Sequence, residues 1–187
     1  MTRWLLWLLG GVLLGGAVHL VTVLVLPRTA AHDAYTRLTP IAPINQVVPI
    51  PPPTADHALL PFMDPAFASA VCRYDLSGGP MKLSITVSQT YTSVSFYTRR
   101  GVAYYAINDR AAGRRVIELD LMTADQRAAM PEEEDVTAAD RLIVESPTLT
   151  GLIAIRALAP EPGLMPMAQQ TVGAAKCQRT ELPKEPD

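Results

Sequence analysis

The chain has 187 residues, 49% of them hydrophobic, and its 16 Lys and Arg residues against 18 Asp and Glu give a formal charge of −2 at pH 7. This mildly acidic balance argues against a nucleic-acid surface, so no nucleic acid is expected as a partner. After an apolar N-terminal segment, the length leaves one domain of ordinary size.

An apolar run without a formal charge extends from Trp4 to Leu26. As a helix it would be roughly 35 Å long, enough to cross a hydrocarbon core of about 30 Å. We therefore predict a transmembrane anchor at residues 1–27. A cleaved secretory signal is the alternative, with residues 29–31 as its cleavage site. Within the run, Gly11 and Gly15 have the spacing that lets a second helix approach closely, so they are candidate helix-association residues.

The only two cysteines, Cys72 and Cys177, both follow the apolar run. In an oxidising compartment such a pair commonly closes a disulfide, and the alternative is two buried thiols. We expect the disulfide, and with it a single-pass protein of the bacterial inner membrane whose N-terminus is cytoplasmic and whose C-terminal domain lies in the periplasm.

Prolines dominate residues 28–65, which we interpret as a linker or arm. Neither a helix nor a central strand can continue far there, so polyproline II and turns are expected. Residues 39–43 and 47–53 are too apolar for a fully solvated stalk. We expect part of this arm to pack on the domain or on a partner.

Residues 66–179 have the pattern of a β-rich domain. Leu83, Ile85 and Val87 alternate with polar residues, which is typical of a half-buried strand. A turn at residues 77–80 should join this strand to the one before it as a hairpin, and a second turn follows at residues 99–101. Residues 151–158 are apolar on both faces, which indicates a central strand. The expected strands are residues 71–76, 82–88, 93–98, 102–107, 115–121, 142–145 and 151–158.

Helical signals are fewer. Thr123 and Gln126 form a capping box, which predicts a short helix to about Met130. The acidic run at residues 132–135 is expected to be a solvated loop, residues 164–176 a last helix, and residues 180–187 a flexible tail. The fold class is therefore mainly β: an antiparallel β-sandwich or small barrel with short helices, preceded by one N-terminal transmembrane helix.

Three segments together resemble a bacterial family called domain of unknown function 1254 (DUF1254). They read Asp-Leu-Ser-Gly-Gly-Pro at residues 75–80, Ser-Phe-Tyr at 95–97, and Ser-Pro-Thr-Leu-Thr-Gly-Leu-Ile-Ala-Ile-Arg at 146–156. The resemblance covers residues 61 to about 158. It implies a β-rich fold and no defined reaction. Larger members carry a second β-rich domain, DUF1214, so the resemblance to the short, membrane-anchored branch implies that a separate DUF1214-type chain is the partner.

One segment departs from the family pattern. Where larger members carry an Asn-x-Asp-Thr-x-Tyr-Ser type sequence, this chain keeps Asp64 and Ser69 but has Phe62, Pro65 and Phe67 at the Asn, Thr and Tyr positions. Several hydrogen-bonding groups are therefore lost, which puts in doubt any ligand role of the segment.

Catalytic residues are poorly represented. The histidines after the apolar run are His32 and His57, both in the arm, and no Gly-x-Ser-x-Gly sequence occurs. We therefore predict no catalytic residue, no metal site and no cofactor. A carboxylate and tyrosine site that includes Asp64 remains the alternative for an enzyme.

Five residues are candidates for contact with a ligand or partner. Arg156 interrupts the central apolar strand, where it either anchors a buried ion pair or a strand end, or binds an anion. Arg99 and Arg100 could form a basic rim with Arg110, Arg114 and Arg115. Tyr104 and Tyr105 should lie on opposite faces of their strand, one in the core and the other free to contact a partner, and Tyr104 is the candidate for that contact. Asp64 is the fifth candidate for contact with a ligand or partner.

The leading hypothesis is a membrane-anchored periplasmic β-domain that acts as a binding or accessory module for another envelope protein. The alternative is a membrane-tethered enzyme or small-ligand-binding protein that uses a cavity in the β-domain.

Overall fold

The computed structural model describes residues 2–29, 33–54, 56–112, 115–130 and 142–180. The chain divides into two units, Met1–Asp33 and Ala34–Asp187. The acidic run at residues 132–135 and the tail after Thr180 were both noted in the sequence, and they lie outside the described residues.

The first unit contains the helix α1 (Thr2–Thr29). Its segment Thr2–Leu26 is long and apolar enough to cross a membrane, although a secretory signal near an N-terminus would have the same properties. A Cβ added at Gly11 or Gly15 would meet no other atom within 4 Å. The role of these two glycines in helix association stays a prediction.

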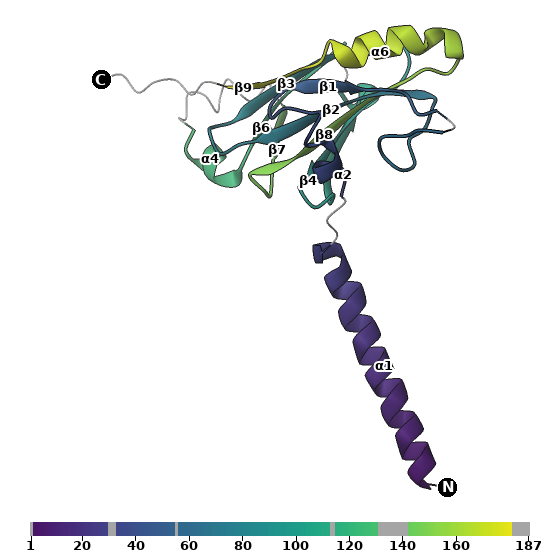
Figure 1. Ribbon diagram of the computed structural model, residues 1–187. Coiled ribbons are helices and arrows are strands. Elements are labelled where there is room, and N and C mark those ends of the chain that lie inside the picture. Colours follow the sequence, from purple (N-terminus) through teal and green to yellow (C-terminus); the bar gives the residue numbers. More distant parts are fainter. Residues whose placement is uncertain (1, 30–32, 55, 113–114, 131–141, 181–187) are drawn as a thin grey trace. The chain divides into compact units, whose positions relative to one another are not determined.

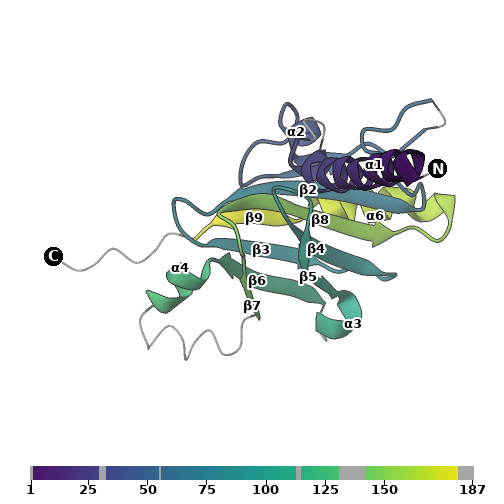
Figure 2. The ribbon, with the colours of Figure 1, turned by 90° about the horizontal axis from the view of Figure 1, so that it is seen from below.

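The second unit is a sandwich of two β-sheets, which confirms the predicted fold class (Figures 1 and 2). The five-stranded sheet has the order β1 (Val47–Ile50), β2 (Phe67–Asp75), β8 (Thr150–Leu158), β4 (Thr92–Thr98) and β5 (Ala103–Asn108). The four-stranded sheet has the order β7 (Leu142–Glu145), β6 (Val116–Met122), β3 (Met81–Thr86) and β9 (Lys176–Arg179). The neighbours in both sheets are antiparallel, except that β6 and β7 are parallel.

The core lies between the sheets and follows the alternation of the sequence. Leu83 and Ile85 on β3 face Phe96 on β4 and Ile153 and Ile155 on β8 within one buried cluster. β8 is the middle strand of its sheet, as its apolar sequence predicts.

The predicted connections between strands are only partly correct. The turn at residues 99–101 joins β4 and β5 as a hairpin, with Gly101 at φ 78°. The turn at residues 77–80 does not make a hairpin, because β2 and β3 belong to different sheets. The short helix α3 (Asp109–Ala112) follows β5 and precedes β6, which belongs to the other sheet. Alternation identifies the buried face of a strand but not its neighbour.

Two helices were predicted in the C-terminal half of the chain. α4 (Ala124–Ala128) begins with the predicted capping box, in which Thr123 accepts from the backbone N–H of Gln126. The last helix is shorter than expected, since η1 (Pro162–Leu164) and α6 (Met165–Gly173) are followed by the strand β9. Figure 1 shows α6 beside β1, and Ala168 and Val172 of α6 are buried in the core.

Strand β9 brings Cys177 to Cys72 of β2. Their Cα atoms are 6.5 Å apart and the sulfurs lie at disulfide distance, as predicted. Both side chains are buried. The disulfide therefore joins the two sheets through the core.

The arm is part of the sandwich and not only a stalk. It contributes the helix α2 (Ala34–Leu38) and the edge strand β1, where Pro49 is tolerated because an edge strand needs fewer N–H donors. Leu38, Ala42 and Ile50 are buried against Val71 and Leu152 on the outer face of the five-stranded sheet. The arm thus covers one part of this outer face and leaves the rest open.

Candidate functional site

The open part of the outer face is centred on Arg156. Strand register places Arg156 of β8 directly opposite Ser69 of β2 on one side and Ser93 of β4 on the other, and Asn108 of β5 follows opposite Ser93. We call these four residues the Arg156 row. Beside it, Ala154, Ser95 and Ala106 form a second row of small side chains. Small residues next to a long one leave room above the sheet.

The other part of the face is held under the arm by Arg73. This side chain is 7% exposed, and its Nη1 donates to the carbonyl oxygens of Thr39 at 3.2 Å and Ala42 at 3.0 Å. Its guanidinium also lies 4.5 Å from the centre of the Tyr35 ring. These contacts fix the arm against β2.

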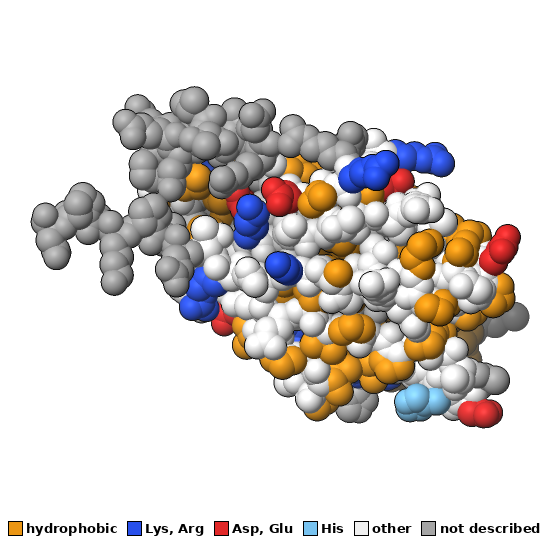
Figure 3. All heavy atoms as spheres, turned by 90° about the horizontal axis from the view of Figure 1, so that it is seen from above, with side chains coloured by type: hydrophobic (Ala, Val, Ile, Leu, Met, Phe, Trp, Pro, Cys, Tyr) orange, Lys and Arg blue, Asp and Glu red, His pale blue; other side chains and the backbone are white. Residues whose placement is uncertain are grey.

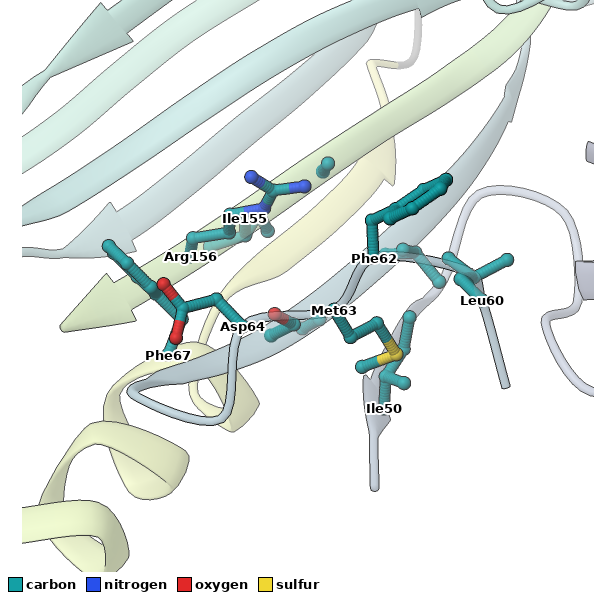
Figure 4. A pocket seen from close by; sticks show the side chains of 12 residues that line it. Ile50, Leu60, Phe62, Met63, Asp64, Phe67, Ile155 and Arg156 are labelled. Atoms are coloured by element: carbon teal, nitrogen blue, oxygen red, sulfur yellow. The ribbon is translucent and has the colours of Figure 1, made fainter. Parts of the chain in front are cut away.

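Three depressions meet at Arg156. The polar depression, of about 380 Å³, lies over Ser93, Ser95, Asn108 and Tyr91. The arm depression, of about 200 Å³, lies over Tyr35, Leu60, Val71 and Leu152. The loop depression, of about 120 Å³, is lined by Phe62, Met63, Asp64 and Phe67 (Figure 4). Each of the three also includes Arg156, which makes this residue their common element.

Arg156 is exposed, so the expectation of a buried ion pair is wrong. Among the described residues its guanidinium has no ion pair or hydrogen-bond partner. The sequence suggested burial because its neighbours are apolar on both faces of β8. On the outer face of β8 the arm covers Leu152, whereas Ala154 and Arg156 lie in the open part.

Asp64 lies near Arg156 but is engaged elsewhere. Its Oδ1 accepts from the backbone N–H of Ala66 at 2.9 Å, and the side chain is exposed. Figure 4 shows its carboxylate turned away from the Arg156 guanidinium. Asp64 therefore shapes the loop before β2 and leaves the charge of Arg156 uncompensated.

The predicted basic rim contributes one residue to this region. Arg99 lines the arm depression, with its guanidinium 5.4 Å from the centre of the Tyr35 ring. Arg100 is exposed in the same turn but is not part of the depression. Arg110 and Arg115 are exposed on α3 and before β6, and Arg114 lies outside the described residues. The structure thus brings together Arg99 and Arg156.

Tyr104 does not point outward, so the expectation of one ring on each face is wrong. A β-bulge between β4 and β5 pairs Phe96 with Tyr105 and Tyr97 with Ala103, which places both Tyr104 and Tyr105 against Phe96. The Tyr104 hydroxyl donates to that of Tyr74 at 3.0 Å. Burial raises the pKa of Tyr104 well above its ordinary range. Tyr104 is therefore a core residue.

Phe62 is the most exposed large apolar side chain in the described part of the domain, at 102%. Its φ of 60° is also unusual for an aromatic residue. Figure 3 shows hydrophobic side chains gathered toward the end of the molecule that carries α6 and the loop between β1 and β2, the loop to which Phe62 belongs. From the sequence, Phe62 was noted only as a departure from a family pattern.

No group of three His, Cys, Asp or Glu side chains that could hold a metal ion occurs among the described residues. The site consists instead of one free guanidinium, hydroxyl and amide groups, and apolar walls.

Comparison with known proteins identifies the family of this chain. A sequence model described as "Protein of unknown function (DUF1254)" matches residues 44–179. The chain belongs to the DUF1254 family. The resemblance recognised from the three sequence segments is thereby confirmed. No curated protein matches the sequence.

Two solved structures resemble the DUF1254 domain. The VPA0106 protein from Vibrio parahaemolyticus has 12% identity and a TM-score of 0.56, over 78% of this chain and 32% of that one. An uncharacterized protein from Burkholderia cenocepacia has 11% identity and a TM-score of 0.48, over 78% of this chain and 36% of that one. This chain therefore spans about a third of the length of both proteins, and the likeness to the first concerns the fold alone.

The third of the segments that resemble DUF1254, residues 146–156, has two separate parts in the structure. Near its start, Ser146 lies 2.9 Å from the buried Tyr74 hydroxyl, and a Cβ at Gly151 would overlap that hydroxyl. At its end, Arg156 occupies the open outer face. The contact between Tyr74 and Ser146 was not predicted from the sequence. The motif that contains Ser146 and Gly151 is the sequence feature that could have indicated it.

Proposed function

We propose that this DUF1254 chain is a single-pass inner-membrane protein whose β-domain acts in the periplasm as a binding or accessory module for another envelope protein. The apolar segment Thr2–Leu26 supports the membrane anchor. The cysteine pair at disulfide distance supports an oxidising compartment.

The binding role is supported above all by the exposure and the backbone conformation of Phe62. A left-handed backbone at a bulky residue costs on the order of 1 to 3 kcal/mol, and an exposed Phe ring forgoes about 1.5 to 3 kcal/mol of burial. Both terms are unfavourable in the free domain, where Phe62 is fully exposed at φ 60°. A partner pocket that encloses the ring would recover the burial term, and aromatic anchors of this kind commonly dominate protein interfaces.

The proposed partner is a second β-rich chain, of the DUF1214 type that accompanies the domain in larger family members. The apolar patch near α6 and the loop between β1 and β2 supplies the contact surface (Figure 3). Pro61, next to Phe62 in the sequence, is also exposed and adds rigid apolar area.

Co-purification tests this proposal. The tagged full-length protein is crosslinked in cells, extracted in mild detergent and examined by mass spectrometry for an exported β-rich protein in constant ratio. Phe62→Ala should lower that ratio at least about tenfold, as expected for a central aromatic anchor. Val102→Ala is the matched control, because Val102 is 61% exposed in the turn before β5. Equal recovery with both variants, or recovery of the protein alone, contradicts the proposal.

A fusion of alkaline phosphatase after residue 187 tests the location. The periplasmic assignment predicts an active fusion, and an inactive one would reverse the topology. Protein cleaved after residue 31 and released from the membrane would instead favour a secretory signal.

The second candidate function is small-ligand binding on the open outer face. The observation that favours it is the polar depression of about 380 Å³, a volume within the range of ligand pockets, beside an uncompensated arginine.

A further inference from the structure

We infer that the three depressions around Arg156 form one binding site for an amphipathic anion, meaning a molecule with an apolar chain and a single carboxylate or phosphate group. The inference rests on the small-ligand candidate above and does not depend on partner docking at Phe62. It assigns the anionic group to Arg156 and the polar depression beside it, and the apolar chain to the floor that the arm and loop depressions share.

The charges around the site favour an anion. Arg156 and Arg99 both line the arm depression, and no acidic residue belongs to its described lining. The polar depression also has Arg156 as its one charged lining residue among those described. Asp64 is the single acid in the three linings, and its Oδ1 is bonded to the Ala66 amide. An arginine without an acidic partner is suited to two parallel hydrogen bonds with a carboxylate or phosphate.

The walls of the arm depression favour an apolar chain. Leu60, Val71, Leu152 and Ala154 lie under it, and Tyr35 closes one side. Leu60, Val71 and Ala154 also line the loop depression, so the apolar floor continues from one depression into the next. An alkyl chain placed here would contact carbon atoms along its length while its charged end reached Arg156.

The opposite side of Arg156 is polar. Ser93 and Ser95 present hydroxyl groups, and Asn108 uses its Oδ1 to accept from the Ala111 amide, which leaves its Nδ2 as a donor. Arg156 therefore stands at the boundary between an apolar and a polar surface. This order of apolar wall, cation and hydrogen-bonding groups matches the order of groups in an amphipathic anion and does not match a purely polar or purely apolar ligand.

Photolabelling of the full-length protein in phosphatidylcholine nanodiscs tests the inference. Three probes carry the same diazirine-bearing alkyl chain and end in a carboxylate, a phosphate monoester or an uncharged alcohol. The carboxylate or the phosphate probe should label peptides that contain Leu60, Val71 or Leu152, and the alcohol should label them at background. The stronger of the two anionic probes identifies the source of the charge.

Arg156→Gln should lower this labelling about tenfold, the effect expected when a charge-assisted hydrogen bond is lost. Arg115→Gln is the control, because Arg115 is exposed outside the three depressions. Ala154→Leu provides a second variant that keeps the arginine but fills the shared floor, and it should also reduce labelling. Thermal unfolding of each variant verifies folding.

Equal labelling by the alcohol and the anionic probes, labelling confined to α1, or labelling unchanged in both Arg156→Gln and Ala154→Leu would overturn the inference. Co-purification through Phe62 is a separate readout. Phe62 does not line the arm depression, so labelling of Val71 and Leu152 should persist in Phe62→Ala even where co-purification is lost, and the two proposals fail separately.

Discussion

The hydroxyl of Tyr74 lies 2.9 Å from Oγ of Ser146 inside the sandwich, although the two residues are 72 positions apart in the sequence. Oγ of Ser146 also donates to the carbonyl of Thr148 at 2.6 Å, and Tyr104 donates to Tyr74. The contact joins β2, β5 and the segment before β8. A buried network of this kind is stabilising only when every member has a partner, and each of these hydroxyl groups has one.

Gly151→Ala should destabilise the domain. The added methyl group would overlap the Tyr74 hydroxyl and the Tyr97 carbonyl oxygen, and overpacking of this kind costs about 1 to 3 kcal/mol. Urea unfolding followed by tyrosine fluorescence measures the change. Gly163→Ala is the control, since a Cβ at Gly163 meets nothing within 4 Å. Equal midpoints for the two variants would refute the packing role of Gly151.

Tyr104→Phe should make the domain less sensitive to alkaline pH. Folding raises the pKa of Tyr104 above the ordinary value of 10.0, so the unfolded chain loses this proton first as pH rises. The stabilisation is complete below about pH 10 and declines above it. Unfolding free energies at pH 8 and at about pH 11 should therefore differ less in Tyr104→Phe than in the unmodified protein. An identical pH profile for Tyr104→Phe and the unmodified protein would contradict the prediction.

Replacing Cys72 and Cys177 together by alanine should lower the free energy of unfolding by about 2 to 5 kcal/mol, because the disulfide closes a loop with a sequence separation of 105. Urea unfolding under non-reducing conditions measures this loss, and the unmodified protein in reductant should approach the stability of the double variant. Mass analysis that finds two free thiols in the exported protein would rule out the bond.

Arg73→Met should loosen the arm. The variant removes the donors to the Thr39 and Ala42 carbonyls, each hydrogen bond to a charged group being worth about 1.5 to 3 kcal/mol. Trypsin should then cleave after Arg37 faster than in the unmodified protein, because Leu38 next to it is normally buried. Arg115→Met should leave the cleavage rate unchanged. Similar rates in Arg73→Met and Arg115→Met would show that Arg73 does not hold the arm.

Much of the fold could be predicted from local patterns. Alternation identified the buried face around Leu83 and Ile85, and the capping box located α4, because both depend on residues close in sequence. Strands β1 and β9 were missed, since one contains Pro49 and the other is four residues long, and each is defined by pairing with a distant strand. The same limitation explains the incorrect hairpin between β2 and β3.

The candidate site was predicted less well. Arg156 was singled out, but its exposure depends on where the arm stops covering the sheet, which only the tertiary structure decides. Tyr104 was assigned to the wrong face because a bulge breaks the period of two. In the sequence, Phe62 was interpreted only as the loss of a hydrogen-bonding residue. The exposure of its ring depends on the tertiary structure around it.

In-cell photocrosslinking from position 62 tests the central proposal most directly. A photoreactive phenylalanine analogue replaces Phe62 in the full-length chain, and a second protein carries it at Val102. The binding-module account predicts one crosslinked product of defined mass from position 62, containing an exported β-rich protein, and none from position 102. The absence of any product from position 62, or the same products from both positions, would contradict it.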